Sequence, residues 1–302
     1  MTAEPSLDEL RHEIDAIDDA IHDLLMKRTG IVEKVREVKR GLAIKIRPAR
    51  EDEIAYRLVS RHQGPFPKRE LLRIWRELIV ATLSFEGPFS VAVHSPEEGG
   101  GYWDLARDHY GSYTPMTGHD SVRRVIESVR SQEATVGILP LPRQDDIDPW
   151  WRHLATESAD APRVIARLPF AGPGNGRDGD LEALVICPIA QEPTGRDRSL
   201  LVVETSETMG IGRLGSKLSD AGMTPLFLAS WHEDQARDTW LFVAEIDDFV
   251  PPDDRRIPRF LDTAGEAIRH VITLGGYAAP LTVEDLGPPA RQPSQPTRTT
   301  ST

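Results

Sequence analysis

The chain has 302 residues, of which 39% are hydrophobic and 28% are charged, the ordinary balance of a globular protein of about two domains. Its single cysteine, Cys187, excludes a disulfide framework, and the scattered histidines show no metal-ligand spacing. The net charge of -12 argues against a general nucleic-acid-binding protein, and the lack of a leader or a long apolar run predicts a cytoplasmic protein without a membrane span.

The first 86 residues predict an all-helical segment. They carry 16 basic and 16 acidic residues, so the negative excess lies wholly in the rest of the chain. Apolar residues recur in heptad steps from Leu10 to Val38, which predicts one helix of about 30 residues, roughly 45 Å long at 1.5 Å per residue. A helix of this kind cannot bury its apolar stripe alone.

Two shorter helices are predicted after the long one. Pro48 and the acidic residues that follow it predict a helix through about His62, and apolar residues at helical spacing predict another from Lys68 to Phe85. Three helices with short connections favour a bundle that a second copy of the chain completes. We therefore expect a helical domain over residues 1–86 that forms a homodimer.

Beyond Gly87-Pro88 the pattern changes to short strands and helices. An α/β domain is predicted over residues 87–200, and a small α+β unit of helix, strand, strand and helix over residues 201–286. A polar, glycine-rich loop is predicted at 172–180, and a disordered tail at 287–302. The predicted strands are 89–94, 135–139, 183–189, 200–204, 224–231 and 239–246, and the predicted helices are 121–131, 212–218 and 260–274.

Arg28 occupies a heptad slot where the pattern requires an apolar residue. A buried cation demands an anionic partner, so Arg28 is a candidate ligand-binding residue. Lys39 lies on nearly the same side of the helix, roughly 16 Å further along, so that both cations can hold one small anion. Arg11 lies roughly 25 Å from Arg28 on a different face, which would require it to come from a second chain. Alternatively, all three are solvated helix residues.

The segment from Leu7 to Glu86 resembles the all-helical chorismate mutases, in particular the N-terminal mutase domain of bifunctional mutase–dehydratase proteins. Five motifs carry the resemblance in order: Leu10-Arg11-x-x-Ile14-Asp15-x-Ile17-Asp18, Leu24-Leu25-x-x-Arg28, Val35-x-x-Val38-Lys39, Arg47-Pro48-x-Arg50-Glu51, and Trp75-Arg76-Glu77-Leu78 through Thr82 to Glu86. The chain differs from many family members at Arg47, where they have an aspartate.

The resemblance implies a role for each matching residue. Arg28, together with Arg11 of a partner chain, would hold the two carboxylates of chorismate, and Lys39 would donate to the ether oxygen of the breaking bond. The other implied roles are a hydroxyl contact by Glu51, support of the carboxylate pocket by Arg50, and closure of the site by Thr82 and Glu86. Glu86 would donate to the ether oxygen only when protonated. The rearrangement needs no metal and no cofactor.

The later segments resemble the other parts of the same bifunctional proteins. Val136 to Pro140 stands where that family has Gly-Val-Val-Pro-Ile-Glu-Asn-Ser, but Leu141-Pro142-Arg143 replaces the polar end, and the Thr-Arg-Phe motif is absent. The resemblance thus implies a dehydratase-like fold without dehydratase activity. The motifs at Gly212 to Leu218 and at Leu274 to Tyr277 resemble those of an ACT regulatory unit, which implies an amino-acid effector.

The sequence therefore predicts a chorismate mutase that converts chorismate to prephenate. One alternative is a bifunctional enzyme that also dehydrates prephenate. A second alternative, from a different class, is a non-catalytic regulatory or nucleic-acid-binding protein that uses the basic residues between Lys34 and Arg50; Arg28 within the heptad pattern disfavours it.

Overall fold

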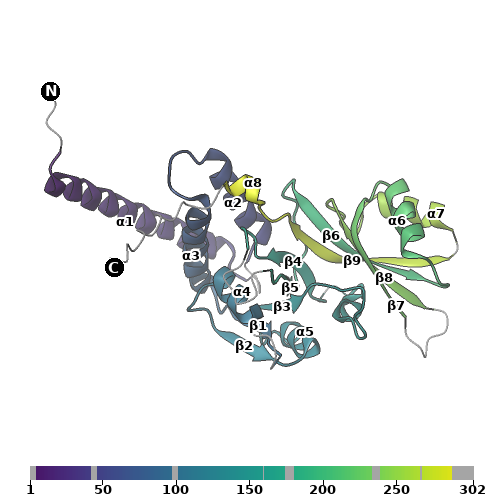
Figure 1. The fold of residues 1–302 in the computed structure, drawn as a ribbon. Helices are drawn as coiled ribbons and strands as arrows, with labels where there is room; N and C mark the ends of the chain where they lie inside the picture. The colour runs from purple at the N-terminus through teal and green to yellow at the C-terminus, as the bar shows by residue number, and fades with distance from the viewer. Residues whose placement is uncertain are drawn as a thin grey trace, which may run out of the picture. The chain divides into compact units, whose positions relative to one another are not determined.

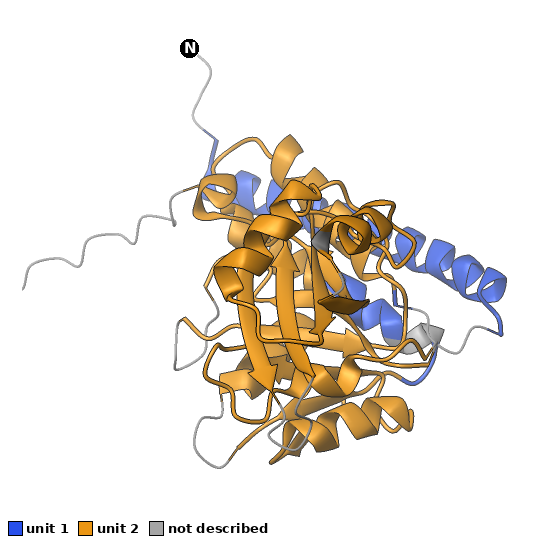
Figure 2. Ribbon diagram, turned by 90° about the vertical axis from the view of Figure 1, so that its right-hand side faces the viewer, with its two compact units in different colours: residues 1–46, 78–88 blue, residues 47–77, 89–302 orange. Residues whose placement is uncertain are grey.

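The computed structural model describes residues 5–41, 46–96, 101–158, 160–173, 180–232, 239–265 and 267–287, without the side chains of residues 84–86 and 264. Its helices and strands are labelled in Figure 1. The chain divides into one unit of residues 1–46 and 78–88 and a second unit of residues 47–77 and 89–302, coloured separately in Figure 2. The tail predicted from residue 287 and most of the loop predicted at 172–180 lie outside the described residues.

The first unit is dominated by helix α1 (Leu7–Val38), which has the length that the heptad pattern predicts. Ser6 caps the helix in a reciprocal capping box with Glu9, which satisfies free backbone N–H groups of its first turn. None of its residues is buried. Its apolar stripe is exposed at Leu7, Leu10, Ile14, Ile17, Ile21, Leu24, Ile31, Val35 and Val38.

Helices α2 (Pro48–Arg61) and α3 (Lys68–Glu86) correspond to the two shorter predicted helices. Pro48 stands at the start of α2, where its missing N–H costs no hydrogen bond. The division into units falls within α3, because Lys68–Glu77 belongs to the second unit and Leu78–Glu86 to the first. The second unit therefore includes α2 and the first half of α3.

The second unit is built on one nine-stranded sheet with the order β2-β1-β3-β5-β4-β9-β6-β8-β7. Strand β1 pairs in parallel with β2 and β3, whereas β5 pairs antiparallel with β3 and β4, and β8 pairs antiparallel with β6 and β7. The strands are β1 (Val91–His94), β2 (Met116–His119), β3 (Val136–Pro140), β4 (Arg163–Leu168), β5 (Ala183–Cys187), β6 (Asp197–Thr205), β7 (Pro225–His232), β8 (Trp240–Ile246) and β9 (Ile268–Ala278).

Short helices connect the strands and bury apolar residues against the sheet. One core surrounds Trp151, Leu184 and Tyr277, and another surrounds Leu214, Phe242 and Phe260. The connecting helices are α4 (Gly101–Tyr110), α5 (Val122–Arg130), the 3-10 helix η1 (Trp150–Leu154), α6 (Ile211–Asp220) and α7 (Arg256–Ala264), and α8 (Val283–Leu286) follows the last strand.

Strands from the two predicted C-terminal domains lie in the same sheet. The expected boundary at residue 200 falls inside β6, and β9 pairs antiparallel with β6 while contacting β4 in parallel at Val164 and Gly275. Gly275 has φ +98°, and a Cβ added there would lie 2.4 Å from the Val164 carbonyl oxygen. A Cβ on Gly276 would lie 2.1 Å from the Arg198 carbonyl oxygen. Both glycines are thus required by the close approach of neighbouring strands.

The prediction of a helix over 260–274 is wrong in its second half. Helix α7 ends at Ala264, Gly265 has φ +87°, and β9 begins at Ile268. The β-branched residues Ile268, Val271, Ile272 and Thr273 favour a strand, and their pairing with β6 outweighs a helical reading of the apolar spacing.

Helix α2 and the first half of α3 share a hydrophobic core with the sheet. Leu58 of α2 and Leu72 of α3 are buried in one cluster with Phe170, Ala278 and Leu281. Polar contacts reinforce this packing: the Tyr56 hydroxyl donates to the Ala279 carbonyl oxygen, Lys68 Nζ donates to the Asp285 carbonyl oxygen at 2.7 Å, and Arg47 pairs with Glu192 at 2.9 Å. These two helical segments are therefore an integral part of the second unit.

Candidate active site

Arg28 lies half-buried on α1 in the slot that interrupts its apolar stripe. Its guanidinium donates to the Leu78 carbonyl oxygen at 3.4 Å, a contact within the first unit. Among the described residues no carboxylate lies within ion-pair distance of Arg28. A charge that is partly withdrawn from water and lacks a counter-ion is suited to receive an anion.

The other two cations predicted on α1 lie at its two ends. Lys39 is the half-buried C-cap residue, and its backbone N–H donates to the Val35 carbonyl oxygen. Arg11 lies on the first turns of the helix, where its side chain is 65% exposed and pairs with Asp8 at 3.2 Å. An ion pair so exposed contributes little to stability, so Arg11 is easily released to another anion.

Two predicted residues lie on the second half of α3. The Thr82 hydroxyl donates to the carbonyl oxygens of Ile79 and Leu78, at 2.8 and 3.2 Å, within its own helix. Donation from Thr82 to a ligand therefore requires rotation of the hydroxyl away from these bonds, whereas its oxygen can still accept a hydrogen bond. Glu86 is the last residue of α3, and its side chain lies outside the described part of the chain.

Glu51, in the second unit, is held by an ion pair that the sequence analysis did not anticipate. Arg76 donates to a Glu51 carboxylate oxygen at 2.5 Å, and both side chains are 13% exposed. Arg76 also lies 3.7 Å from the buried carboxylate of Asp52. Burial raises the pKa of Asp52 well above its ordinary value, while the positive charge of Arg76 opposes this rise. Arg76 thus faces two acidic neighbours from α2.

The signal that could have found Arg76 is the one that identified Arg28. Arg76 stands between Leu72 and Ile79, at helical spacing, where the buried stripe of α3 requires an apolar residue. Burial lowers the pKa of His109 on α4 well below its ordinary value, and the charge of Arg76 lowers it further. Arg76 therefore interacts with both α2 and α4.

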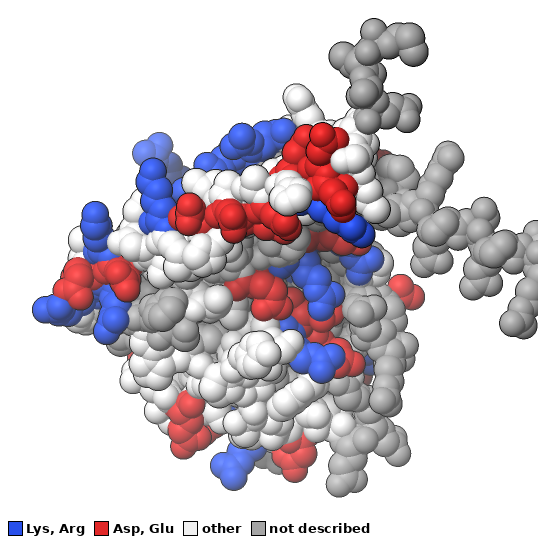
Figure 3. Space-filling view, turned by 90° about the vertical axis from the view of Figure 1, so that its left-hand side faces the viewer, with Lys and Arg blue, Asp and Glu red and all other residues white. Residues whose placement is uncertain are grey.

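The basic residues between Lys34 and Arg50 are more neutralised than their sequence suggests. Arg40 pairs with Glu37, Arg50 pairs with Glu53 at 3.0 Å, and Arg47 pairs with Glu192, which is remote in sequence. Basic and acidic side chains are mixed on the face drawn in Figure 3. Arg50, predicted to support a carboxylate pocket, is 56% exposed in its pair with Glu53.

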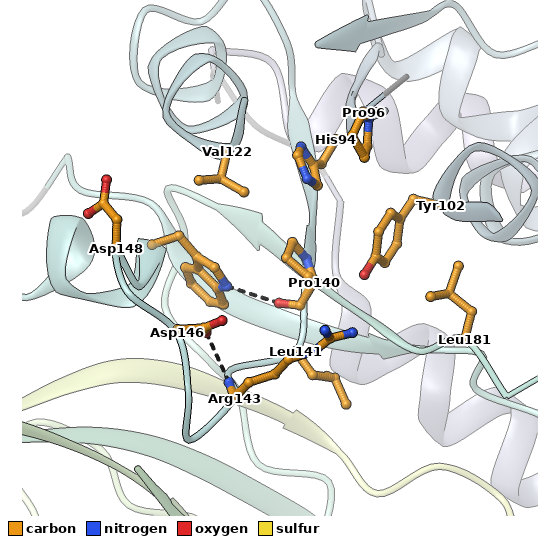
Figure 4. Close-up of a pocket in the computed structure, with 11 residues that line it drawn as sticks. His94, Pro96, Tyr102, Val122, Pro140, Leu141, Arg143, Asp146, Asp148 and Leu181 are labelled. Carbon is orange, nitrogen blue, oxygen red and sulfur yellow. Dashed lines mark hydrogen bonds between the residues drawn. The ribbon is translucent and has the colours of Figure 1, made fainter. Parts of the chain in front are cut away.

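The segment with dehydratase-like sequence borders a cavity of about 390 Å³ in the second unit. Strand β3 ends at Pro140, whose carbonyl oxygen accepts a hydrogen bond from Trp150 Nε1 at 3.0 Å. Leu141 and Arg143 follow and line the cavity with His94 from the end of β1 and Tyr102 from α4 (Figure 4). No carboxylate or amide stands at positions 141–143, where the family has its polar residues.

The motif from Leu274 to Tyr277 has a structural role in β9. Leu274 is fully buried, and the Tyr277 hydroxyl donates to Glu245 at 2.6 Å while accepting from Arg167 at 3.0 Å. This network joins β9 to β4 and β8. On β7, Trp231 donates to the Ile147 carbonyl oxygen and stacks under Arg152.

The sequence model of the chorismate mutase type II family matches residues 10–87. A bifunctional chorismate mutase/prephenate dehydratase of Aquifex aeolicus (strain VF5) is 32% identical over 140 residues, which are 45% of this chain and 38% of that protein. A relative of the same description from Stutzerimonas stutzeri is 27% identical over 147 residues, 47% of this chain and 40% of that protein. The chain thus spans about two fifths of the length of these relatives.

Among solved structures, the prephenate dehydratase of Arthrobacter aurescens in complex with L-Phe aligns with a TM-score of 0.46 at 13% identity, over 67% of this chain and 94% of that chain. At this TM-score the likeness supports no conclusion about activity. No helix in the described ranges is both long and apolar enough to cross a membrane. Residues 10–87 thus match the type II chorismate mutase family, and the chain is similar over part of its length to the bifunctional chorismate mutase/prephenate dehydratases.

Proposed function

We propose that this protein is a chorismate mutase that rearranges chorismate to prephenate. The observation that carries the proposal is Arg28, a half-buried cation without a described carboxylate partner, in the middle of the segment that matches the mutase family. Chorismate is a dianion, and its rearrangement proceeds within one molecule. The enzyme must hold the substrate in a compact conformation and stabilise the negative charge that develops on its ether oxygen.

In this proposal the cations of α1 bind different groups of the substrate. Arg28 binds one carboxylate, and Lys39 binds a carboxylate and donates to the ether oxygen. Removal of one such preorganised donor typically costs about two to three orders of magnitude in rate. Further roles follow from the family resemblance: Arg50 and Glu51 contact the carboxylate and hydroxyl groups, and Thr82 and Glu86 close the site.

Arg11 is proposed to act in the site of a second copy of the chain. Arg11 and Arg28 are 17 residues apart on one straight helix, roughly 25 Å at 1.5 Å per residue, too far to hold the same small substrate from one chain. The exposed apolar stripe of α1 supplies the surface for a homodimer, because a solvated helix of this kind gains its stability by packing.

We propose that the protein does not dehydrate prephenate at the cavity beside Pro140. Leu141, Pro142 and Arg143 replace the polar residues expected there, and the Thr-Arg-Phe motif is absent before β5. The bifunctional enzyme remains the alternative. We also propose that an amino-acid effector binds the unit that contains α6 and β9, and that the protein is cytoplasmic. We propose no nucleic-acid partner.

The test is to incubate the purified protein with chorismate and to identify the products. We expect chorismate to disappear and prephenate to accumulate, without phenylpyruvate above the uncatalysed background. Arg28→Ala should lower kcat/KM by about two orders of magnitude or more. Lys27→Ala, at the neighbouring exposed position, is the matched control and should leave the rate unchanged. Equal rates for Arg28→Ala and the wild type would contradict the proposal, and phenylpyruvate would establish the bifunctional alternative.

The shared site is tested by mixing two inactive variants. After subunit exchange, Arg11→Ala and Arg28→Ala should form heterodimers in which one site carries both substitutions and the other carries neither. Recovery of activity is therefore expected. Exchange that is verified by mass, without recovery, would mean that Arg11 and Arg28 act within one chain.

A further inference from the structure

The cavity beside Pro140 has the features of a small-molecule site. Its volume of about 390 Å³ lies within the range of roughly 300–1,000 Å³ that is usual for ligand pockets. It is bordered by the ends of β1 and β3, by α4, and by the segment that leads to η1 (Figure 4). Its lining residues are His94, Pro96, Tyr102, Val122, Pro140, Leu141, Arg143, Asp146, Asp148, Trp150 and Leu181.

Two opposite charges lie unpaired on its wall. Within the described ranges, no acidic side chain pairs with the Arg143 guanidinium, and no basic side chain pairs with Asp146. One Asp146 oxygen accepts the Arg143 backbone N–H at 3.0 Å, which leaves the second oxygen available. Both charges act on the Tyr102 hydroxyl: burial raises the pKa of Tyr102, Arg143 opposes the rise, and Asp146 adds to it. Both residues line the cavity, and the hydrogen bond from the Arg143 backbone to Asp146 places them side by side on its wall.

The other ionisable groups of the wall do not add free charge. Asp148 pairs with Arg123 at 2.7 Å and with Arg152 at 2.6 Å, so its charge is already balanced. Burial lowers the pKa of His94 and favours its neutral form at pH 7. Among the described residues that line the cavity, Arg143 is thus the one cation that remains available to a ligand.

The rest of the cavity is apolar and aromatic. Trp150 is buried, and its ring orientation is fixed by the hydrogen bond to Pro140. Val122, Leu141 and Leu181 complete a surface that suits a hydrocarbon or aromatic side chain. A ligand that matches this wall has one anionic group, one cationic group and an apolar body.

We propose that this cavity binds a free amino acid with a large apolar or aromatic side chain, whose carboxylate contacts Arg143 and whose ammonium group contacts Asp146. A dicarboxylate is disfavoured, because it would meet one available cation and the repulsion of Asp146. The cavity is separate from the effector site proposed near α6 and β9. The binding proposal can be tested separately from the proposed mutase activity, because neither Arg143 nor Asp146 belongs to the proposed mutase site.

Calorimetric titration of the full chain, without chorismate, tests the proposal. The probes are L-phenylalanine, 3-phenylpropionate, 2-phenylethylamine and prephenate. We expect L-phenylalanine to bind. The two analogues that lack one charge should bind at least roughly tenfold more weakly, because each loses one charge-assisted contact. Tighter binding of prephenate than of L-phenylalanine, or no binding of L-phenylalanine, would overturn the proposal.

Variants locate the site. Arg143→Gln and Asp146→Asn should each weaken L-phenylalanine binding roughly tenfold or more, while Arg143→Lys retains part of the affinity. Asp145→Asn is the matched control, because Asp145 is an exposed neighbour that does not line the cavity. If Arg143→Gln and Asp146→Asn bind L-phenylalanine as the wild type does, the amino acid binds elsewhere and the assignment is wrong. Melting temperatures of the unliganded variants, expected to match the wild type, verify that each variant is folded.

Discussion

Helix α1 and the nine-stranded sheet differ in how far their apolar residues are buried. The 32 residues of α1 include none that is buried, and Leu24 is 64% exposed although it belongs to a regular apolar stripe. In the sheet, β5 is buried at every residue. The sheet buries its apolar residues within one chain, whereas the apolar stripe of α1 stays exposed in the part of the chain that the structure describes. An apolar pattern therefore identifies a buried face without telling which chain buries it.

The largest effect is expected from a charge on the exposed stripe of α1. Ile17→Glu should prevent the proposed homodimer, and loss of the partner's Arg11 from each site should lower mutase kcat/KM by about two orders of magnitude or more. Light scattering would measure the molecular mass, and circular dichroism the helix content. His12→Glu places the same charge away from the stripe and should change neither the molecular mass nor the mutase rate. An unchanged mass and rate for Ile17→Glu would show that α1 serves another purpose.

A smaller effect is expected at Arg76, which we infer positions Glu51. Arg76→Gln removes the 2.5 Å contact and should lower mutase kcat/KM by roughly one to two orders of magnitude, since a misplaced group can cost about a hundredfold. Arg73→Gln is the control on the same helix, because Arg73 is 59% exposed in its pair with Asp108. Arg76→Lys should restore part of the rate.

A double-mutant cycle separates positioning from general stability. If Arg76 acts through Glu51, Arg76→Gln should have little further effect on kcat/KM in a Glu51→Gln background. Additive losses in folded variants would instead mean that Arg76 supports the helices without positioning Glu51.

The smallest effect concerns the buried carboxylate of Asp52. Because burial raises its pKa in the folded state, its contribution to stability is present below the unfolded pKa near 3.9 and is lost as the pH rises through the folded value. Asp52→Asn removes this loss, so it should be more stable than the wild type at pH 7. The advantage should shrink toward pH 4.

Denaturant unfolding between about pH 4 and pH 8, around the aspartate reference value, measures this difference. Glu53→Gln, at an exposed acid one residue away, should follow the wild type at every pH. Arg76, Glu51 and Asp197 are the charged groups that act on Asp52, and Arg76 opposes the rise in its pKa. Parallel pH profiles for Asp52→Asn and the wild type would show that Arg76 cancels the cost of burial.

Local pattern predicted the three N-terminal helices, because Pro48, the heptad spacing and the glycine and proline breaks act within a few residues. It failed at 260–274, where pairing of β9 with a strand some 70 residues earlier decides the conformation. Arg28 was found through its interrupted stripe, and Arg76 was missed although it interrupts the stripe of α3 in the same way. The unpaired charges of Arg143 and Asp146 could not be predicted, because the cavity is assembled from four separate segments.

Strand β6 bears on how the chain can be shortened. Because β6 crosses residue 200 and β9 lies between β4 and β6, a truncation at residue 200 would remove the neighbour of β4 and turn it into an exposed edge strand. Unpaired edges of this kind recruit other chains and promote aggregation. Gly275 and Gly276 allow the close approach of the Val164 and Arg198 backbones. In a fragment that holds only the C-terminal part, these neighbouring backbones would be absent. The sheet is therefore one structural unit, and a shortened chain should keep all nine of its strands.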